Sequence, residues 1–399
     1  MMEAPTLNLF SEAESEPFAT GILPSQAIRT LIDTGKIISN EPIFDSQIQP
    51  ASIDLRLGKI AYQVRASFLP GQSTIERKIR DLLIRQVSLE DSAVFAPNSV
   101  FIVPLVERLA LPADVSGKAN PKSTTGRLDI FTRLITEPGR EFEWVPKGYK
   151  GALYLEIVSR TFPIVLRAGM KLNQLRLVRG NPPVTDGMLA RLAEKERLVY
   201  EDDENPIGPQ IQRGLSVSVD LQGNGSNIVA YRAKKNTPPV DLDKVNCYDS
   251  GEFWDIIHTP SSKTLILNPH DFYILASWER IAVPPNYAAE MVPFDPSIGE
   301  FRIHYAGFFD PGFGHGVNGT KAVLEVRAHE VPILLEDRQL VGKLIYHKMA
   351  KKPDKIYGPS IGSSYQQQGL TLSKQFKRLA YADTESIPAE GPTLVPSAS

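Results

Sequence analysis

The chain has 399 residues, more than one hydrophobic core normally organises, so two or three domains are expected. Hydrophobic residues make up 42%, charged residues 23%, and the formal net charge is -2, which excludes the basic excess that binding to a nucleic-acid polymer would require. No stretch of about 18 apolar residues is present, so we expect no membrane partner. The N-terminus lacks the regions of a signal peptide and the single cysteine, Cys247, allows no internal disulfide, so we expect a cytoplasmic protein.

The first residues are polar and aperiodic, and we predict that residues 1–18 are disordered. The first helix is predicted to begin at Pro24 and Ser25 and to end at Gly35, because apolar residues recur along one side of it. The 32 prolines and 28 glycines divide most of the remaining chain into short apolar or alternating runs. This is the pattern of a mainly β protein.

The chain contains the same sequence pattern twice. FIVPLVERLALP (Phe101–Pro112) followed by LYLEIVSR has its counterpart in YILASWERIAVP (Tyr273–Pro284) followed by AVLEVRA, and SIDLRL upstream corresponds to SVDLQG. A repeat of this length is a whole domain rather than a solenoid module. We therefore predict two tandem domains of the same fold, residues 19–180 and residues 213–382.

A helical segment separates the two repeats. GMLARLAEKERLVY, from Gly187, has helical spacing and is followed by the polar segment EDDENPIGPQ. We predict that residues 181–212 form a helical connector. The residues after 382 are rich in proline and serine, and we predict that residues 383–399 are disordered.

A cluster of cations and hydroxyl groups marks the first repeat. Lys122, Ser123, Thr124 and Arg127 lie within six residues around Gly126, directly before an apolar strand. Hydroxyl and charged donors on a backbone turn suit the oxygens of a polyphosphate. The alternative is a solvated polar hairpin turn.

Glu156 is the candidate acid or base. It lies in the middle of GALYLEIV, whose two alternating sets of side chains are both largely apolar, so the strand should be buried on both faces. Burial would raise the pKa of this carboxyl group towards the range that is useful for proton transfer, and we expect Arg127 to be its partner. The alternative is a structural glutamate–arginine pair, which Glu325 at the equivalent position of the second repeat supports.

Five segments, taken in order, resemble one enzyme family. They are QIQPASIDLRLG (Gln47–Gly58), the KSTTGR segment, GYKG before LYLEI, PIVLRAGMKLNQL from Pro163, and SSYQQQG (Ser363–Gly369). They resemble the deoxycytidine triphosphate deaminases of the dUTPase-like superfamily, and the duplicated length resembles the long bacterial form. The resemblance implies two tandem dUTPase-like distorted jelly-roll β-barrels with a few short helices. It also implies a homo-oligomer, of which a trimer of two-barrel chains is one form, with active sites at subunit interfaces.

The resemblance assigns roles to the cluster in the first repeat. Glu156 falls on the family's catalytic glutamate, and Ser123 and Arg127 fall on the hydroxyl and the arginine beside that glutamate and the phosphates. Lys122 stands where many members have arginine, so the charge is kept but the two-pronged geometry is lost. Thr124, next to them, is expected to bind substrate as well.

The resemblance also reaches the base and the tail. Thr136 falls where the family usually has a small residue near the cytosine ring. Tyr365 and Gln368 match the aromatic residue and the glutamine of the C-terminal tail that folds over the nucleotide, although Ser364 replaces the lysine that often precedes the tyrosine.

The implied reaction is zinc-independent hydrolysis of dCTP to dUTP and ammonia, a step of dUTP and dTTP synthesis. Glu156 would take a proton from the water that attacks C4, pass one to N3 and later help ammonia to leave. Zinc deaminases need an H-x-E and P-C-x-x-C set of ligands, which one cysteine cannot supply. Mg²⁺ would enter only with the substrate triphosphate.

The second repeat differs at the phosphate-binding segment. PFDPSIGEFR carries Asp295 and Glu300 where phosphate oxygens would need donors, so we expect no nucleotide binding there. It contains FFDPGFG, in which Asp310 resembles the aspartate that activates water in dUTPases, whereas the first repeat has Pro146 at that place. The alternatives are therefore a dUTP diphosphatase or a bifunctional deaminase and diphosphatase, and a non-catalytic nucleotide-binding protein on the same barrel.

Overall fold

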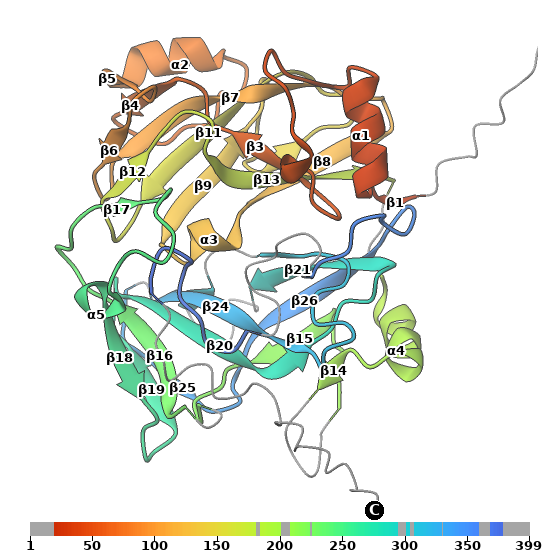
Figure 1. The fold of residues 1–399 in the computed structure, drawn as a ribbon, viewed down its shortest axis with the longest axis vertical. Helices are drawn as coiled ribbons and strands as arrows, with labels where there is room; N and C mark the ends of the chain where they lie inside the picture. The colour runs from red at the N-terminus through yellow and green to blue at the C-terminus, as the bar shows by residue number, and fades with distance from the viewer. Residues whose placement is uncertain are drawn as a thin grey trace, which may run out of the picture.

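The computed structural model describes residues 20–180, 184–200, 208–223, 226–293, 301–303, 307–328, 330–358 and 368–377. The termini for which disorder is predicted lie outside these residues. The described chain forms two β-barrels, barrel 1 above barrel 2 in Figure 1, with a few short helices. The predicted mainly β fold with two tandem barrels is confirmed. In the described part of the chain, each helix is too short or too polar to cross a lipid bilayer.

Barrel 1 is built mainly from two antiparallel sheets. Their strand orders are β5-β4-β7-β11-β9, with β2 on β7, and β1-β13-β8-β10, with β3 on β13. The strands are β1 (Gly21–Ile22), β2 (Ile37–Ile38), β3 (Ile53–Arg56), β4 (Ile60–Val64), β5 (Leu83–Ser88), β6 (Ala93–Phe95), β7 (Val100–Ala110), β8 (Val115–Pro121), β9 (Ile130–Ile135), β10 (Trp144–Val145), β11 (Lys150–Ser159), β12 (Ile164–Leu166) and β13 (Lys171–Arg179).

Barrel 2 repeats this topology, except that its described strands include no counterpart of β1. Its sheets have the orders β18-β16-β20-β24-β22, with β14 on β20, and β15-β26-β21-β23. The strands of the second half are β14 (Val199–Tyr200), β15 (Leu215–Ser218), β16 (Ile228–Ala233), β17 (Val240–Asp241), β18 (Trp254–His258), β19 (Thr264–Leu267), β20 (Phe272–Ile281), β21 (Tyr287–Pro293), β22 (Phe301–Ile303), β23 (Phe308–Phe309), β24 (Thr320–Ala328), β25 (Ile333–Glu336) and β26 (Leu340–Lys348). The repeated segments occupy equivalent strands, β7 with β20 and β11 with β24, so the predicted duplication is confirmed.

Both predicted helices are present. Helix α1 (Ser25–Asp33) follows Pro24 and buries Ile28 and Leu31, as the spacing of its apolar residues indicates. Helix α4 (Asp186–Lys195) lies in the predicted connector and begins at Thr185, whose side chain accepts a hydrogen bond from the backbone N–H of Met188. The expected helical spacing extends further than the helix does, because the residues after it form β14 and add to the sheet of barrel 2.

The sequence did not reveal the remaining helical segments, which are short. Helix α2 (Ile75–Leu82) packs Ile75 and Ile79 onto a cluster with Ile102 and Ile135 on the sheet of barrel 1. The other segments are α3 (Ser123–Gly126), α5 (Ser250–Phe253) and the 3₁₀ turn η1 (Asp45–Gln47). Helix α3 is the segment that projects from barrel 1 towards β24 of barrel 2 (Figure 1).

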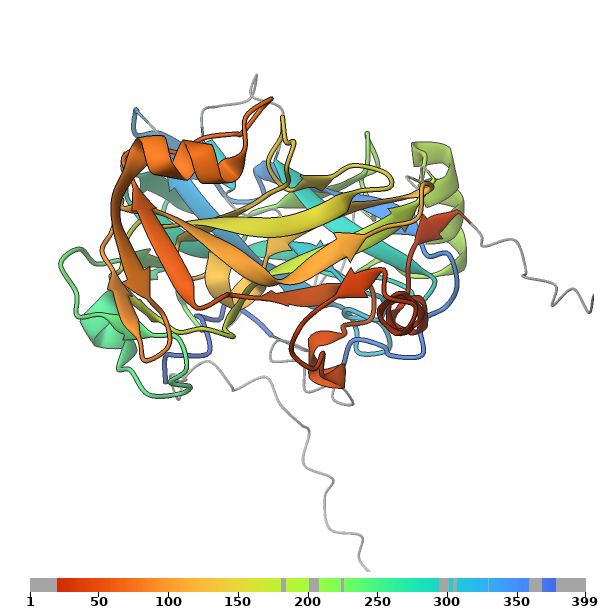
Figure 2. The same cartoon turned by 90° about the horizontal axis from the view of Figure 1, so that it is seen from above.

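The two barrels share an apolar core at their junction. Phe162 of barrel 1 lies edge-on to Phe253 and Trp254, with ring centroids 5.9 and 5.3 Å away, and Phe376 of the C-terminal tail packs against the same rings. Strand β17 also pairs with β12, so a strand from the second half extends a small sheet of barrel 1. Figure 2, viewed from above, shows barrel 1 stacked over barrel 2.

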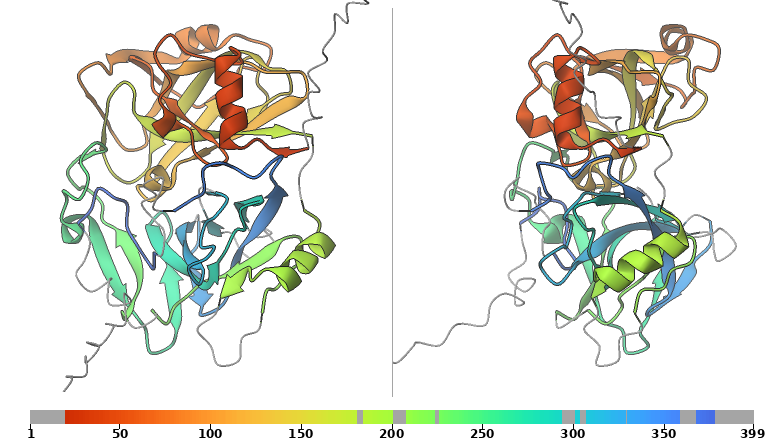
Figure 3. Two further views of the ribbon diagram at one scale, coloured as in Figure 1. Left: turned by 45° about the vertical axis from the view of Figure 1, so that its right-hand side comes forward. Right: turned by 90° about the vertical axis from the view of Figure 1, so that its right-hand side faces the viewer.

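Buried ion pairs cross the same junction. Arg176 of β13 donates to a carboxylate oxygen of Asp310 at 3.2 Å, and its guanidinium group lies over the ring of Phe308. Arg327 of β24 donates to Asp129, the residue that precedes β9. Because a buried charge is costly without its partner, these pairs favour one relative position of the barrels. Figure 3 shows the resulting contact from two further sides.

We predict that Phe376→Ala lowers the free energy of unfolding by about 3 kcal/mol, because it removes a buried ring from the junction. Chemical denaturation followed by tryptophan fluorescence measures this. The matched control is Phe44→Ala, at a ring that is 61% exposed, which should change stability by less than about 0.5 kcal/mol. Equal losses in the two variants would contradict the importance of the junction core.

Candidate active site

The segment predicted to bind phosphate in the first repeat is a single helical turn. Helix α3 lies between β8 and β9, and its backbone N–H groups at Gly126 and Arg127 donate to the carbonyl oxygens of Lys122 and Ser123. The predicted backbone turn is therefore present. Helix α3 projects out of barrel 1 and packs against barrel 2. No local feature of the sequence segment predicts this contact.

A pocket lies where α3 meets barrel 2, and both barrels line it. Barrel 1 contributes Lys122, Ser123 and Arg127. Barrel 2 contributes the carboxyl groups of Asp310 and Glu325. The remaining wall is mostly apolar and aromatic, with Gln368 of the tail at its rim; it includes Met291, Phe308, Phe309, Phe313 and Tyr357. We call this the composite pocket, since neither barrel forms it alone.

Glu325 is the acid of the composite pocket. It lies on β24, only 6% exposed, and directly faces α3. A Cβ atom added to Gly126 would lie 2.3 Å from Oε2 of Glu325, so glycine is needed for the carboxyl group to come this close. Burial raises the pKa of Glu325 well above its ordinary value, while Arg127 opposes the increase and Asp129 adds to it. The buried position therefore favours the protonated form of this carboxyl group more than exposure to water would.

Arg127, directly after α3, connects this segment to the C-terminal tail. Its guanidinium group, in a residue only 3% exposed, donates to the side-chain oxygen of Gln368 at 2.9 Å and to the carbonyl oxygen of Thr371 at 3.0 Å. The hydroxyl of Ser373 donates to the carbonyl oxygen of Thr124. Gln368 and Thr124 thus lie where the tail meets α3. Tyr365, the other predicted tail residue, lies outside the described residues.

Two further ion pairs set the charge of the pocket. The ammonium group of Lys122 donates to Asp54, a buried carboxylate on β3, and is itself about one quarter exposed. On the opposite side Asp310 pairs with Arg176. Burial raises the pKa of Asp310, and Arg176 acts against that increase. The carboxylates of Asp54 and Asp310 therefore each have a cation nearby. Ser123 is exposed at the mouth of the pocket.

The structure does not bring Glu156 together with Arg127. Glu156 is fully buried on β11, and its Oε1 accepts hydrogen bonds from Arg133, with an Nε distance of 2.8 Å. The expected partner was wrong, because the register of β9 and β11 sets Arg133 opposite Glu156 whereas α3 carries Arg127 away towards barrel 2. Arg133 also stacks on the ring of Phe142, 3.8 Å from its centroid. Within the chain this geometry is that of a structural glutamate–arginine pair, and a catalytic role for Glu156 stays a prediction.

Thr136 is also outside the composite pocket. It follows β9, is buried, and its hydroxyl lies 3.4 Å from the carbonyl oxygen of Trp144. The segment of the second repeat that carries Asp295 and Glu300 lies outside the described residues. Asp310 of the second repeat lines the same pocket as Lys122 and Arg127 of the first repeat, so these groups meet across the barrel junction of one chain.

Sequence reasoning gave Glu325 a structural role and missed its place in the pocket. The resemblance implied active sites at subunit interfaces, which indicated that one site can draw on more than one barrel. In a duplicated chain the neighbour of barrel 1 is barrel 2, so the acid that faces Ser123 and Arg127 has to come from the second repeat. The sequence paired the acid and the donors within one repeat, whereas in the described chain the acid that faces the donors is Glu325 of the second repeat.

The composite pocket combines two chemical functions. A buried carboxyl group with a raised pKa can take up and release protons, and the cations and hydroxyl group of barrel 1 can bind an anion. The aromatic wall can pack against a planar base. Fold and pocket together define a class of two-barrel protein with the dUTPase-like fold and, at the barrel junction, a pocket suited to a planar, anionic ligand.

The chain belongs to the dCTP deaminase family. Residues 19–181 match the 2'-deoxycytidine 5'-triphosphate deaminase N-terminal domain and residues 185–376 match the C-terminal domain. The chain is also similar to the crystal structure of 2'-deoxycytidine 5'-triphosphate deaminase from Agrobacterium tumefaciens, with 49% identity and a TM-score of 0.79, over 84% of this chain and 100% of that one.

Shorter relatives match about half of the chain. A dCTP deaminase (dUMP-forming) from Nanoarchaeum equitans is 31% identical over 184 residues, which cover 41% of this chain and 87% of the relative. A dCTP deaminase from Natronomonas pharaonis is 29% identical over 201 residues, which cover 48% of this chain and 95% of the relative. The resemblance inferred from the five sequence segments is therefore confirmed.

We predict that Arg127→Met raises the pKa of Glu325 further, because the positive charge of Arg127 favours the ionised carboxylate. Subtracting the infrared spectrum of the matching protein with Glu325→Gln isolates the carboxyl band of Glu325. The intensity of this band can then be followed against pH. Arg133→Met, on the other side of barrel 1, is the control and should leave this pKa in place. An unchanged titration in Arg127→Met would show that the two groups do not interact.

Proposed function

We propose that the chain catalyses the hydrolytic deamination of dCTP to dUTP and ammonia in the composite pocket. The observation that carries this is the position of Glu325, a buried and protonatable carboxyl group of barrel 2, against the Ser123 and Arg127 segment of barrel 1. Membership of the dCTP deaminase family supports the reaction. The acid we assign is Glu325 rather than Glu156.

In this mechanism one carboxyl group acts first as base and then as acid. Ionised Glu325 takes a proton from water as the oxygen attacks C4 of cytosine, and the proton passes to N3. A second proton from the attacking oxygen then reaches the 4-amino group, the C4–N bond breaks and ammonia leaves. A raised pKa suits both halves, because the group must accept and release a proton near neutral pH. Arg127 keeps the ionised form accessible.

The donors of barrel 1 are assigned to the triphosphate. Lys122 and Arg127 supply positive charge and Ser123 a hydroxyl at the exposed mouth of the pocket. Mg²⁺ would arrive with the triphosphate, bound mainly by phosphate oxygens and water. We propose a zinc-independent reaction, since a chain with a single cysteine lacks the ligand pattern of the zinc deaminases.

The assay should distinguish dUTP from the alternative product dUMP. Several curated relatives are named dUMP-forming, and Asp310 lines the same pocket as Arg127. In this chain the carboxylate of Asp310 is paired with the guanidinium group of Arg176, which works against its acting as a free base. We therefore expect dUTP as the product, and chromatography of the nucleotides distinguishes it from dUMP with pyrophosphate.

We predict that Glu325→Gln reduces kcat for dCTP by at least about 1,000-fold while dCTP still binds, because an amide cannot shuttle the proton. Ammonia release measures turnover, and calorimetry measures binding. The matched variant is Glu156→Gln, the same change at the equivalent position of the first repeat, which should keep turnover within about tenfold of the unaltered enzyme.

The opposite pattern would overturn the assignment. Loss of turnover in Glu156→Gln with turnover kept in Glu325→Gln would place the chemistry at barrel 1, with donors from another subunit. Tight binding of dCTP without ammonia release by the unaltered chain would instead support a non-catalytic nucleotide-binding protein.

The assembly is a separate part of the proposal. A homo-oligomer, with a trimer as one form, is implied by the family resemblance, and a reducing cytoplasmic setting agrees with the single cysteine, Cys247. The composite pocket draws on both barrels of one chain, so a partner subunit is not required to complete it.

We predict that turnover per chain stays constant when the enzyme is diluted until sedimentation shows single chains. A rate that falls in step with dissociation would contradict this.

A further inference from the structure

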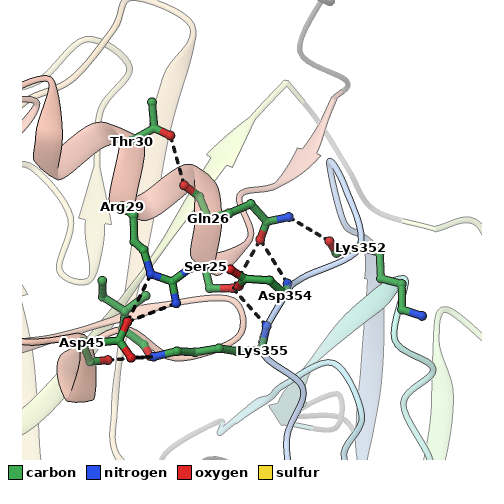
Figure 4. Close-up of polar contacts among 9 residues, drawn as sticks. Ser25, Gln26, Arg29, Thr30, Asp45, Lys352, Asp354 and Lys355 are labelled. Atoms are coloured by element: carbon green, nitrogen blue, oxygen red, sulfur yellow. Dashed lines mark hydrogen bonds and ion pairs between the residues drawn. The ribbon is translucent and has the colours of Figure 1, made fainter.

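The segment that leaves barrel 2 is fastened to barrel 1. Residues 349–358, which we call the strap, follow β26 and run beside the first strand and helix of barrel 1 (Figure 4). The N–H of Ala350 donates to the carbonyl oxygen of Ile22 at 2.9 Å. A Cβ atom on Gly21 would lie 2.3 Å from the nitrogen of Ala350, so the strap and β1 approach each other at glycine.

A chain of alternating charges holds the strap to α1 and η1. We call Ser25, Arg29 and Asp45 of barrel 1, together with Asp354 and Lys355 of the strap, the latch. Ser25, which is fully buried, donates to one oxygen of Asp354, and Arg29 donates to the other at 2.5 Å. Arg29 also donates to Asp45 at 3.1 Å, and Lys355 pairs with Asp45 at 2.7 Å. Figure 4 shows Arg29 between the two carboxylates.

The latch differs from an ordinary surface ion pair. Asp354 is held by a buried hydroxyl as well as by a cation, although its side chain is 48% exposed. Partial burial acts to raise the pKa of Asp354, but the hydrogen bonds from Ser25 and Arg29 outweigh it and lower the pKa. Lys355 also donates to the carbonyl oxygen of Ile48 at 3.0 Å. Several linked contacts fix a geometry better than one exposed pair does.

The strap leads directly from the latch into the composite pocket. Two residues after Lys355, Tyr357 lines the pocket, and its ring lies 5.5 Å from that of Phe313. The N–H of Tyr357 donates to the carbonyl oxygen of Pro311, next to Asp310. The strap is therefore bound to barrel 1 at the latch and to barrel 2 at Tyr357, and the tail that carries Gln368 to Arg127 follows it in the sequence.

We propose that the latch positions one wall of the composite pocket: it fixes the strap so that Tyr357 stays in place against Phe313 and lines the pocket. The inference rests on the proposed function, because the pocket is taken as the dCTP site. The latch touches none of the reacting atoms, so its residues are positioning residues. Losing it should weaken substrate binding and leave the proton chemistry of Glu325 unchanged.

Asp354→Ala tests this on the full chain. We expect KM for dCTP to rise about fivefold or more, kcat to stay within about twofold, and the pH profile of kcat to keep its shape. Arg29→Lys, which keeps a positive charge towards Asp354, should retain most of the affinity for dCTP. Lys351→Met, at an exposed strap residue outside the latch, is the control and should match the unaltered enzyme.

Limited proteolysis provides a readout that does not depend on turnover. Trypsin should cut the strap after Lys355 faster in Asp354→Ala than in Lys351→Met, because the latch holds this bond against barrel 1. If the unaltered chain fails to deaminate dCTP, the proposed function fails while this comparison still decides whether the latch holds the strap. A lower melting temperature with unchanged KM and unchanged strap cleavage would overturn the proposal and leave the latch a purely stabilising contact.

Discussion

The composite pocket depends on one contact between the barrels, the carboxyl group of Glu325 buried against α3. The acid belongs to the second repeat and the donors around Arg127 belong to the first, so the pocket exists only while the barrels keep their relative position. The Arg176–Asp310 and Arg327–Asp129 pairs cross the junction and are buried. Such pairs add little net stability, but breaking one is costly, and they therefore select this arrangement over others.

Duplication explains why two similar glutamates have different surroundings. Glu156 and Glu325 lie on equivalent strands, β11 and β24, yet only Glu325 faces the phosphate-binding segment of a neighbouring barrel within the chain. Glu156 has Arg133 across the strand pair, and this neutralises its charge locally. The two repeats thus both contribute to the composite pocket: barrel 1 contributes cationic and hydroxyl side chains, and barrel 2 contributes the buried carboxyl group of Glu325.

The C-terminal part of the chain connects these halves a second time. It leaves barrel 2, passes barrel 1 at the latch, lines the pocket at Tyr357, meets Arg127 through Gln368 and is buried at Phe376 in the junction core. Burial of Phe376 among aromatic rings stabilises the docking of this C-terminal segment, and the polar contacts fix its position on the two barrels.

The sequence by itself determined what depends on local periodicity and residue type: the β class, the duplication, helices α1 and α4, and the turn of cations and hydroxyl groups at residues 122–127. It could not decide which acid that turn meets. Strand register paired Glu156 with Arg133, and the docking of the barrels brought Glu325 to α3. Contacts between residues so distant in the chain leave no periodic pattern, because they follow from how two finished barrels pack, and only the tertiary structure fixes that.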